Sequence, residues 1–258
     1  MPRFAANVTT MFREMPFSRR FDAAASEGFT AVEMQFPYSP RAEDLSMWAQ
    51  NAGVEIALIN CPPGNWDAGD RGLAALPGRE HDFRESVALG LRYARILGAA
   101  KLHIMAGLTT QGAAREIYVQ NLTWAAAEAG RAGVLAVLEA INPVDMPNYF
   151  VNRQANTASV VEEIGSPYLA LQMDCYHMGM MGEDVVATLG RYKHLCGHVQ
   201  IADVPGRHEP GTGTLNYPAV FQALDDLGYK GWTGCEYTPA DDTHAGLSWR
   251  ERYLGLSY

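Results

Sequence analysis

Residues 116–142 read EIYVQNLTWAAAEAGRAGVLAVLEAIN, and they contain one complete helix-to-strand step of the fold. Residues 116–132 have a helical pattern, and Gly133 follows at the position where helices commonly end in a left-handed turn. Residues 135–141 are almost entirely apolar, which predicts a strand that is buried on both faces. Such strands belong to parallel sheets that are covered by helices.

The same step recurs along the whole chain. Apolar runs predict eight strands, at residues 3–7, 31–35, 55–60, 102–107, 135–141, 169–174, 196–203 and 232–237. Helical patterns lie between them, at residues 17–27, 44–52, 81–97, 116–132, 157–164, 184–194 and 217–227. Eight units in 258 residues give about 32 residues per unit, a size that is typical of a (β/α)8 TIM barrel.

The alternative to a closed barrel is a doubly wound open sheet, because alternating strands and helices also form that fold. An open sheet usually has fewer strands, and no GxGxxG motif follows the first predicted strand. We therefore predict an α/β fold with a single TIM-barrel domain over residues 1–258. One connection, at residues 61–80 (CPPGNWDAGDRGLAALPGRE), exceeds a simple turn, and its apolar residues favour an ordered lid over a plain surface excursion.

Composition and charge exclude several classes of protein. The chain has 29 acidic and 20 basic residues, a net charge of −9, and an acidic surface disfavours binding to nucleic acids and to anionic membranes. The four cysteines contain no CxxC pair, which indicates reduced thiols rather than a disulfide framework. We find no secretory leader and no apolar run of about 18 residues, so we expect a cytoplasmic protein.

Four polar side chains interrupt or end the last four predicted strands: Glu139, Asp174, Gln200 and Glu236. The carboxyl ends of barrel strands build the active sites of TIM-barrel enzymes. Three carboxylates buried together would repel one another, and a divalent cation would offset that repulsion. Oxygen donors favour a hard ion, so we predict one Mg²⁺ or Mn²⁺. The alternative is that each carboxylate caps a helix or pairs with an arginine.

Further residues are candidates for binding a substrate. His177, in DCYHMG, is placed to donate a hydrogen bond or to relay a proton. Arg207, in DVPGRHEPGTGTLNY, is the best candidate for a substrate carboxylate, because a guanidinium matches that anion. Glu33 and Asn60 lie near predicted strand ends, although Glu33 could instead orient a neighbour. Trp66 in the lid would exclude water from the site.

The positions of the lysines argue against two other reaction mechanisms. The chain has only three lysines, Lys101, Lys193 and Lys230, and none falls at the carboxyl end of a predicted strand. A Schiff-base mechanism is therefore disfavoured, and so is a hydride shift that enlists a lysine. His198 shares its strand parity with Gln200 but lies deeper in the barrel, which favours a core or supporting role.

The chain resembles the xylose isomerase-like superfamily, and within it the hydroxypyruvate isomerase family with the closely similar 2-oxo-tetronate isomerases. The resemblance runs nearly end to end and is carried by eight motifs: MPRFAANV (1–8), RFDAAASEGFTAVEMQFPY (20–38), LPGRE (76–80), LEAIN (138–142), QMDCYHM (172–178), GHVQIAD (197–203), RHEPGTGTLNY (207–217) and GWTGCEY (231–237).

This resemblance implies a site and a reaction. It implies that Glu139, Asp174, Gln200 and Glu236 hold one divalent ion, with Gln200 where related epimerases have a histidine, and that Glu139 and Glu236 are the catalytic acid and base. The implied reaction interconverts hydroxypyruvate and tartronate semialdehyde by metal-assisted proton transfer through a cis-enediolate. The implied partner is a small anionic sugar acid, and related barrels suggest a homodimer or homotetramer.

Several alternatives remain at this point. One is a 2-oxo-tetronate isomerase, and another is an epimerase or lyase that acts on a different small sugar acid. An abasic-site endonuclease of the same superfamily is disfavoured by the acidic charge and by the lack of a histidine-rich metal cluster. A non-catalytic sugar-acid binder is disfavoured because it needs no paired acid and base.

Overall fold

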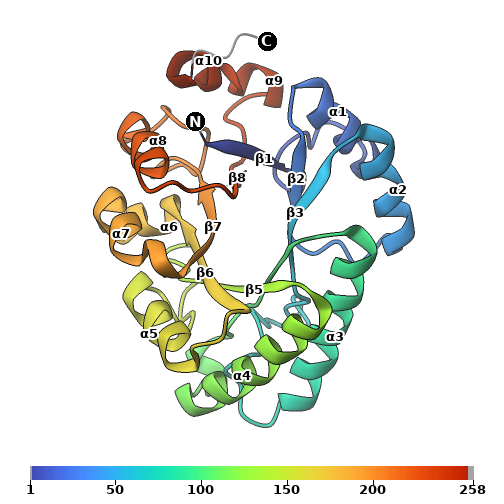
Figure 1. The fold of residues 1–258 in the computed structure, drawn as a ribbon, viewed down its shortest axis with the longest axis vertical. Helices are drawn as coiled ribbons and strands as arrows, with labels where there is room; N and C mark the ends of the chain where they lie inside the picture. Colours follow the sequence, from blue (N-terminus) through green and yellow to red (C-terminus); the bar gives the residue numbers. More distant parts are fainter. Residues whose placement is uncertain (1, 255–258) are drawn as a thin grey trace.

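Eight parallel strands close into a barrel in sequence order, each paired with the next and β8 with β1 (Figure 1). The computed structural model describes residues 2–254. The strands are β1 (Arg3–Asn7), β2 (Ala31–Met34), β3 (Glu55–Asn60), β4 (Lys101–His103), β5 (Leu135–Glu139), β6 (Leu169–Asp174), β7 (Cys196–Ile201) and β8 (Trp232–Cys235). The predicted TIM barrel is confirmed, and the open sheet is excluded.

Helices surround the barrel in a single outer layer (Figure 1). They are α1 (Arg20–Ser26), α2 (Ala42–Ala52), α3 (Glu80–Leu97), α4 (Arg115–Ala132), α5 (Gln154–Ile164), α6 (Cys175–Met180), α7 (Val185–Tyr192), α8 (Tyr217–Asp226), α9 (Thr243–Gly246) and α10 (Ser248–Leu254). Short 3₁₀ turns are η1 (Phe17–Arg19), η2 (Thr109–Gln111) and η3 (Lys193–Leu195).

Two different layers form the interior. The main hydrophobic core lies between the helices and the outer faces of the strands, where Phe4 packs edge-on against Phe221 of α8 and Trp249 of α10. Side chains alternate along a strand, so Ala5 and Asn7 point the opposite way, into the barrel. A small separate cluster of Ala5, Ala31 and Ala57 reflects this inner layer. The inside of the barrel thus has small apolar side chains at its base and polar side chains above them.

Three differences from the predicted elements affect the site. The strand predicted at residues 102–107 is shorter, because β4 ends at His103 and the chain then joins the lid through a bridge between Gly72 and Ala106. Helix α6 was not predicted. It begins directly after β6 because the Asp174 side chain accepts a hydrogen bond from the Tyr176 amide. The short helices α9 and α10 were not predicted either.

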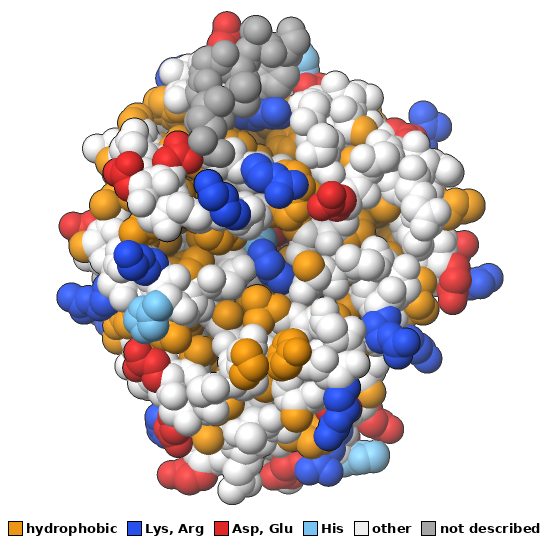
Figure 2. Space-filling view, viewed as in Figure 1, with side chains coloured by type: hydrophobic (Ala, Val, Ile, Leu, Met, Phe, Trp, Pro, Cys, Tyr) orange, Lys and Arg blue, Asp and Glu red, His pale blue; other side chains and the backbone are white. Residues whose placement is uncertain are grey.

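The outer surface mixes charges of both signs. Figure 2 shows acidic and basic side chains interspersed over the face that it presents. Large exposed apolar side chains, such as Met47 and Tyr168, are scattered, which is ordinary for a protein surface. No helix within residues 2–254 is long and apolar enough to cross a membrane.

The connection at residues 61–80 is ordered and anchored. Its second half is buried through Leu73, Ala74, Ala75 and Leu76. Gly72 forms the bridge to Ala106 with a φ of +107°, and a Cβ there would lie 2.4 Å from the Met105 carbonyl. This close approach holds the lid segment against the end of β4.

We expect Gly72→Ala to cost about 1–3 kcal/mol more free energy of unfolding than Gly69→Ala, because an added methyl group overpacks this contact. Gly69 is the matched control, since its φ is +99° and nothing lies within 4 Å of its ideal Cβ position. Urea denaturation of both variants measures the difference. Equal losses would show that the close approach to Met105 does not anchor the lid.

Candidate active site

A cavity of about 430 Å³ opens at the carboxyl ends of the strands. Six of the predicted site residues line it: Asn60, Trp66, Glu139, His177, Arg207 and Glu236. Trp66 covers one side, where its ring meets Phe36 at a centroid distance of 5.6 Å and carries the Arg71 guanidinium 3.7 Å above it. The geometry therefore brings side chains from the lid, the strand ends and the β7–α8 loop around one space.

Three buried carboxylates crowd this cavity. Glu139 ends β5, Asp174 ends β6, and Glu236 follows β8 directly. Burial raises the pKa of Glu139 well above its ordinary value, and the neighbouring Asp174 and Glu236 charges raise it further. Burial likewise raises the pKa of Asp174 to about 7, although Arg207 opposes that shift. Burial also raises the pKa of Glu236.

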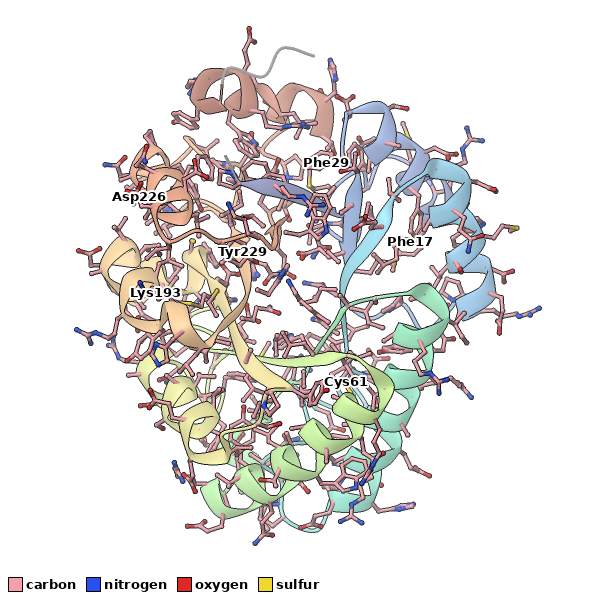
Figure 3. All side chains as sticks on the ribbon, in the orientation of Figure 1. Phe17, Phe29, Cys61, Lys193, Asp226 and Tyr229 are labelled. Atoms are coloured by element: carbon pink, nitrogen blue, oxygen red, sulfur yellow. The ribbon has the colours of Figure 1, made fainter. Side chains whose placement is uncertain are left out.

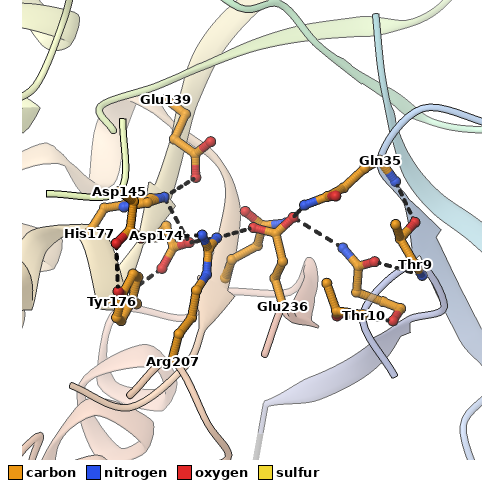
Figure 4. Close-up of polar contacts among 12 residues, drawn as sticks. Thr9, Thr10, Gln35, Glu139, Asp145, Asp174, Tyr176, His177, Arg207 and Glu236 are labelled. Carbon is orange, nitrogen blue, oxygen red and sulfur yellow. Dashed lines mark hydrogen bonds and ion pairs between the residues drawn. The ribbon is translucent and has the colours of Figure 1, made fainter. Parts of the chain in front are cut away.

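Arg207 supplies the positive charge among these carboxylates (Figure 4). Its Nη2 lies 2.9 Å from Glu236 Oε2 and 3.8 Å from Asp174 Oδ2, and its Nη1 lies 3.5 Å from Asp145 Oδ2. Burial alone would lower the pKa of the guanidinium, but these carboxylates outweigh burial and raise it. Arg207 has a φ of +55°, a left-handed conformation that is uncommon outside glycine and is found preferentially at functional sites.

Hydrogen bonds fix the tautomer of His177. The Asn142 Oδ1 accepts hydrogen bonds from the Val144 and Asp145 amides, both at 3.0 Å, so its Nδ2 must face His177 Nδ1 at 2.7 Å. The Nδ1 atom is therefore an acceptor, and Nε2 carries the ring hydrogen. Burial lowers the pKa of His177 well below its ordinary value, so the ring is neutral.

The donor set fits a hard divalent cation. Glu139 Oε1 and Asp174 Oδ2 are buried and lack a hydrogen-bond partner, and both lie within 4 Å of His177 Nε2. If all three carboxylates are ionised, one guanidinium leaves two negative charges uncompensated, which matches a divalent ion in sign and size. Because His177 Nε2 carries a hydrogen, the oxygens of Glu139 and Asp174 are the better ligands of this cluster.

Three of the predicted residues, Asp174, Gln200 and Glu33, are not among those that line the cavity. Gln200 is buried with both amide ends engaged: its Oε1 accepts from Gln172 Nε2 at 2.6 Å, and its Nε2 donates to Glu33 Oε1 at 2.7 Å. Glu33 is fully buried, and His198 Nε2 occupies its second oxygen at 2.8 Å. Both Glu33 oxygens are thus engaged by buried side chains, which agrees with the alternative that Glu33 orients its neighbours, whereas its contact with substrate stays a prediction. Gln200 lies beside Asp174 in the register of β6 and β7.

Sequence reasoning missed three residues around the cavity: His103, Asn142 and Asp145. His103 ends β4 with both ring nitrogens unpaired, 3.6 Å from Glu139 Oε2, and burial lowers its pKa to about 3. A polar residue inside a predicted apolar strand was its signal, the same signal that identified Glu139. Asn142 and Asp145 follow β5 in a loop, where the sequence gives no periodicity from which to place a side chain.

Known proteins resemble this chain over nearly its whole length. A family model described as "Xylose isomerase-like TIM barrel" matches residues 21–253. The 2-oxo-tetronate isomerase of Cupriavidus necator is 48% identical, covering 99% of this chain and 100% of that protein. The hydroxypyruvate isomerase of Escherichia coli is 39% identical, covering 98% and 100%.

Solved structures agree with the fold. A structure titled "AP endonuclease, family 2" from Brucella melitensis superposes with a TM-score of 0.94 at 42% identity, covering 98% of this chain and 99% of that chain. The D-psicose 3-epimerase of Clostridium cellulolyticum H10 superposes with a TM-score of 0.78 at 17% identity, covering 98% and 99%. The second likeness shows the shared fold alone.

We expect the stability of the cation-free protein to depend on pH through Asp174. Its carboxyl holds a proton more tightly in the folded state, with a pKa of about 7, than in the unfolded chain, with a pKa of 3.8. The free energy of unfolding from this group therefore falls as pH rises from about 4 to about 7. Asp174→Asn removes this pH-dependent loss. The free energy of unfolding of the variant should therefore rise relative to that of the wild type as pH rises.

Urea denaturation in the presence of a chelator, at pH 5 and at pH 7.5, measures this difference. Comparing the two proteins at each pH cancels the titration of all other groups that the substitution leaves unchanged. A difference that is constant with pH, or that grows toward acid pH, would contradict the raised pKa of Asp174.

Proposed function

The chain belongs to the xylose isomerase-like TIM barrel family and is an isomerase, and from this premise we propose that it interconverts hydroxypyruvate and tartronate semialdehyde. The observation that carries the proposal is the pair of buried glutamates, Glu139 and Glu236, which line one cavity with Arg207 between the carboxylates. Such a pair suits an aldose–ketose shift, in which one proton leaves and another returns.

The reaction moves one proton between neighbouring carbons. A base removes a proton from C3 of hydroxypyruvate, the electron pair passes to the C2 carbonyl oxygen, and a cis-enediolate forms. The C3 hydroxyl passes its proton to the C2 oxygen and becomes the aldehyde, and an acid returns a proton to C2. Atoms and charge balance without an oxidant or a second substrate.

The contacts support different roles for the two glutamates. Glu236 accepts hydrogen bonds from Gln35 Nε2 at 2.8 Å and Asn7 Nδ2 at 3.2 Å, in addition to its pair with Arg207. These donors favour the ionised carboxylate, so we assign Glu236 as the base. Glu139 receives fewer donors than Glu236 and has one oxygen without a hydrogen-bond partner, so we assign it as the acid that delivers the proton.

Other residues bind and shield the substrate in this proposal. Arg207 reaches the cavity from its loop and offers its guanidinium to the substrate carboxylate, sharing it with Glu236. His177 directs its Nε2 hydrogen toward the substrate oxygens. The Asn60 side chain lines the cavity, and Trp66 limits the access of water to the enediolate.

One divalent cation, Mg²⁺ or Mn²⁺, completes the proposed site. Glu139 and Asp174 would hold it, joined by Glu236 and by Gln200 if its amide oxygen leaves Gln172. When bound, the ion supplies positive charge that stabilises developing negative charge on substrate oxygens.

A four-carbon substrate is the second candidate. The protein named 2-oxo-tetronate isomerase shares 48% of its residues with this chain, and the same proton transfer applies to a 2-oxo acid with one further hydroxymethyl group. Epimerase and lyase reactions on other sugar acids stay alternatives. We do not propose the endonuclease activity for which the Brucella melitensis protein is named, because a net charge of −9 opposes the binding of DNA phosphates. Cytoplasmic location and a homo-oligomeric state stay predictions.

The substrate can be determined by proton NMR in D₂O. We expect protein supplied with Mg²⁺ or Mn²⁺ to convert hydroxypyruvate or 2-oxo-tetronate with solvent deuterium entering at C2, and chelated protein to lose this activity. The faster substrate identifies the reaction. Strict retention of the substrate hydrogen would contradict proton transfer, and no conversion of either compound would favour an epimerase or lyase.

The two roles can be separated with isosteric variants. Each of Glu139→Gln and Glu236→Gln should lower kcat by about 10²–10⁴-fold. Glu139→Gln retains the base, so it should still exchange the C3 protons of hydroxypyruvate with D₂O without forming product. Glu236→Gln should lose both exchange and turnover. The reverse pattern would exchange the two assignments, and near-normal turnover of either variant would refute the pair.

A further inference from the structure

A line of polar side chains crosses the inside of the barrel from its base to the cavity. Lys101 is the first residue of β4, so it lies at the end of the barrel opposite the cavity. Its Nζ is 3.1 Å from His198 Nδ1, and His198 Nε2 is 2.8 Å from Glu33 Oε2. The side chains of His198 and Glu33 have no exposed surface. The proposed reaction assigns a role to none of these three residues.

The lysine determines which ring nitrogen of His198 carries the hydrogen. An ammonium group has donors and no acceptor, so Lys101 can only donate to Nδ1. The neutral ring then carries its hydrogen on Nε2 and donates it to Glu33. In the other tautomer, two acceptors, Nε2 and the Glu33 carboxylate, would face each other at 2.8 Å. Lys101 thus selects the tautomer that Glu33 requires.

Hydrogen bonds connect Glu33 to both catalytic glutamates through neighbouring amide side chains. Its Oε1 accepts hydrogen bonds from Gln200 Nε2 at 2.7 Å and from Asn7 Nδ2 at 3.1 Å. Asn7 Nδ2 also lies 3.2 Å from Glu236 Oε1. A carboxylate accepts hydrogen bonds, so Glu33 sets the direction of the Gln200 amide. It also supports the direction of the Asn7 amide, whose Oδ1 accepts a hydrogen bond from the Thr9 amide at 3.0 Å.

The other branch runs through Gln200. With its Nε2 directed at Glu33, its Oε1 faces Gln172 Nε2 at 2.6 Å. Gln172 is paired with Glu139 in the register of β5 and β6, and its side chain lowers the pKa of Glu139. The orientation of Gln200 therefore depends on the hydrogen bond that Glu33 accepts, and the surroundings of Glu139 depend on Gln200.

The barrel leaves space for this arrangement at Gly234 on β8. A Cβ at that position would lie 2.2 Å from Glu33 Oε2 and 2.4 Å from Oε1. Strand β8, which is separated from β2 by β1, therefore carries no side chain at the point where the Glu33 carboxylate crosses the interior. Close approach of this kind is a common reason for a glycine inside a strand.

The outer end of the line remains accessible. Lys101 lines a cavity of about 430 Å³ at the base of the barrel, together with Lys193, Tyr229 and Lys230. Figure 3 shows Lys193 and Tyr229 on the α7–α8 side of the barrel. No carboxylate of the described residues forms an ion pair with Lys101, whose hydrogen bond in this line is to the His198 ring.

We propose that Lys101 is a positioning residue for the catalytic glutamates: it fixes the His198 tautomer, and through Glu33 it holds the Gln200 and Asn7 amides in the directions that their contacts require. The inference rests on the proposed function for its effect on turnover, and on geometry alone for its effect on the His198 ring. It assigns a role to the end of the barrel that is remote from the substrate.

The test combines ring spectroscopy with kinetics. In ¹⁵N-histidine-labelled protein, long-range ¹H–¹⁵N correlation reports which nitrogen of His198 is protonated, and a His198→Gln variant assigns the signal. We expect the hydrogen on Nε2 in the wild type and in Lys101→Arg, which still donates. Lys101→Met should shift the ring toward the other tautomer and lower kcat by about 10–100-fold, with KM within about twofold of the wild type.

Lys230→Met is the matched control, because Lys230 lines the same cavity and does not contact His198. It should change neither the ring signals nor kcat. If Lys101→Met does not fold, Lys101→Gln replaces it, since its amide no longer dictates a single tautomer. Thermal unfolding of each variant excludes a general loss of structure.

Three results would overturn the proposal. These are a wild-type His198 with its hydrogen on Nδ1, a Lys101→Met variant with unchanged ring signals, and a variant whose tautomer changes while kcat does not. The ring measurement needs no substrate. Inactivity of the wild type on both 2-oxo acids would therefore contradict the proposed function. The ring measurement would still test whether Lys101 fixes the His198 tautomer.

Discussion

Three buried carboxylates share one guanidinium at the carboxyl end of the barrel, and this excess of negative charge constrains everything around it. Arg207 pairs with Glu236 at 2.9 Å but lies 3.8 Å from Asp174 and leaves Glu139 with an unpaired oxygen. Charges in a poorly solvated space must be matched by donors or protons. The hydrogen bonds that Glu236 accepts come from Asn7 and Gln35, which lie near the other end of the sequence. The barrel interior below the cavity is polar for this reason.

The barrel itself could be predicted from the sequence because its signals are local. Each strand is a buried apolar run, and helices such as α3 and α4 end at glycines with left-handed φ, Gly98 and Gly133. Errors arose where a tertiary contact ended an element. Residues 104–107 are as apolar as a strand, yet there the chain leaves the sheet to pair with the lid at Gly72. Helix α6 depends on a single cap by Asp174, which a sequence pattern does not show.

The sequence predicted which strands carry the site residues but not the directions in which their side chains point. Parallel strands bring their carboxyl ends to one rim, so Glu139, Asp174 and Glu236 had to converge once the barrel was inferred. Side-chain direction follows instead from hydrogen bonds between distant strands. Gln200 lies on the correct strand but turns its amide to Gln172 and Glu33, and Glu33 is held below the cavity by His198. No local pattern records these pairs, because their partners lie up to 167 residues apart in the sequence.

A polar interior has a consequence for how this barrel is stabilised. Buried polar and ionic groups contribute little net stability even when they are paired, since desolvation offsets most of their attraction. The free energy that keeps the barrel closed must therefore come mainly from the outer layer, where side chains such as Phe4, Phe221 and Trp249 pack between helices and strands. The inner hydrogen bonds instead select one arrangement, because each acceptor, such as Glu33, admits only donors. Stability and specificity thus reside in different layers, so the residues inside can be arranged for chemistry without the barrel depending on them to stay folded.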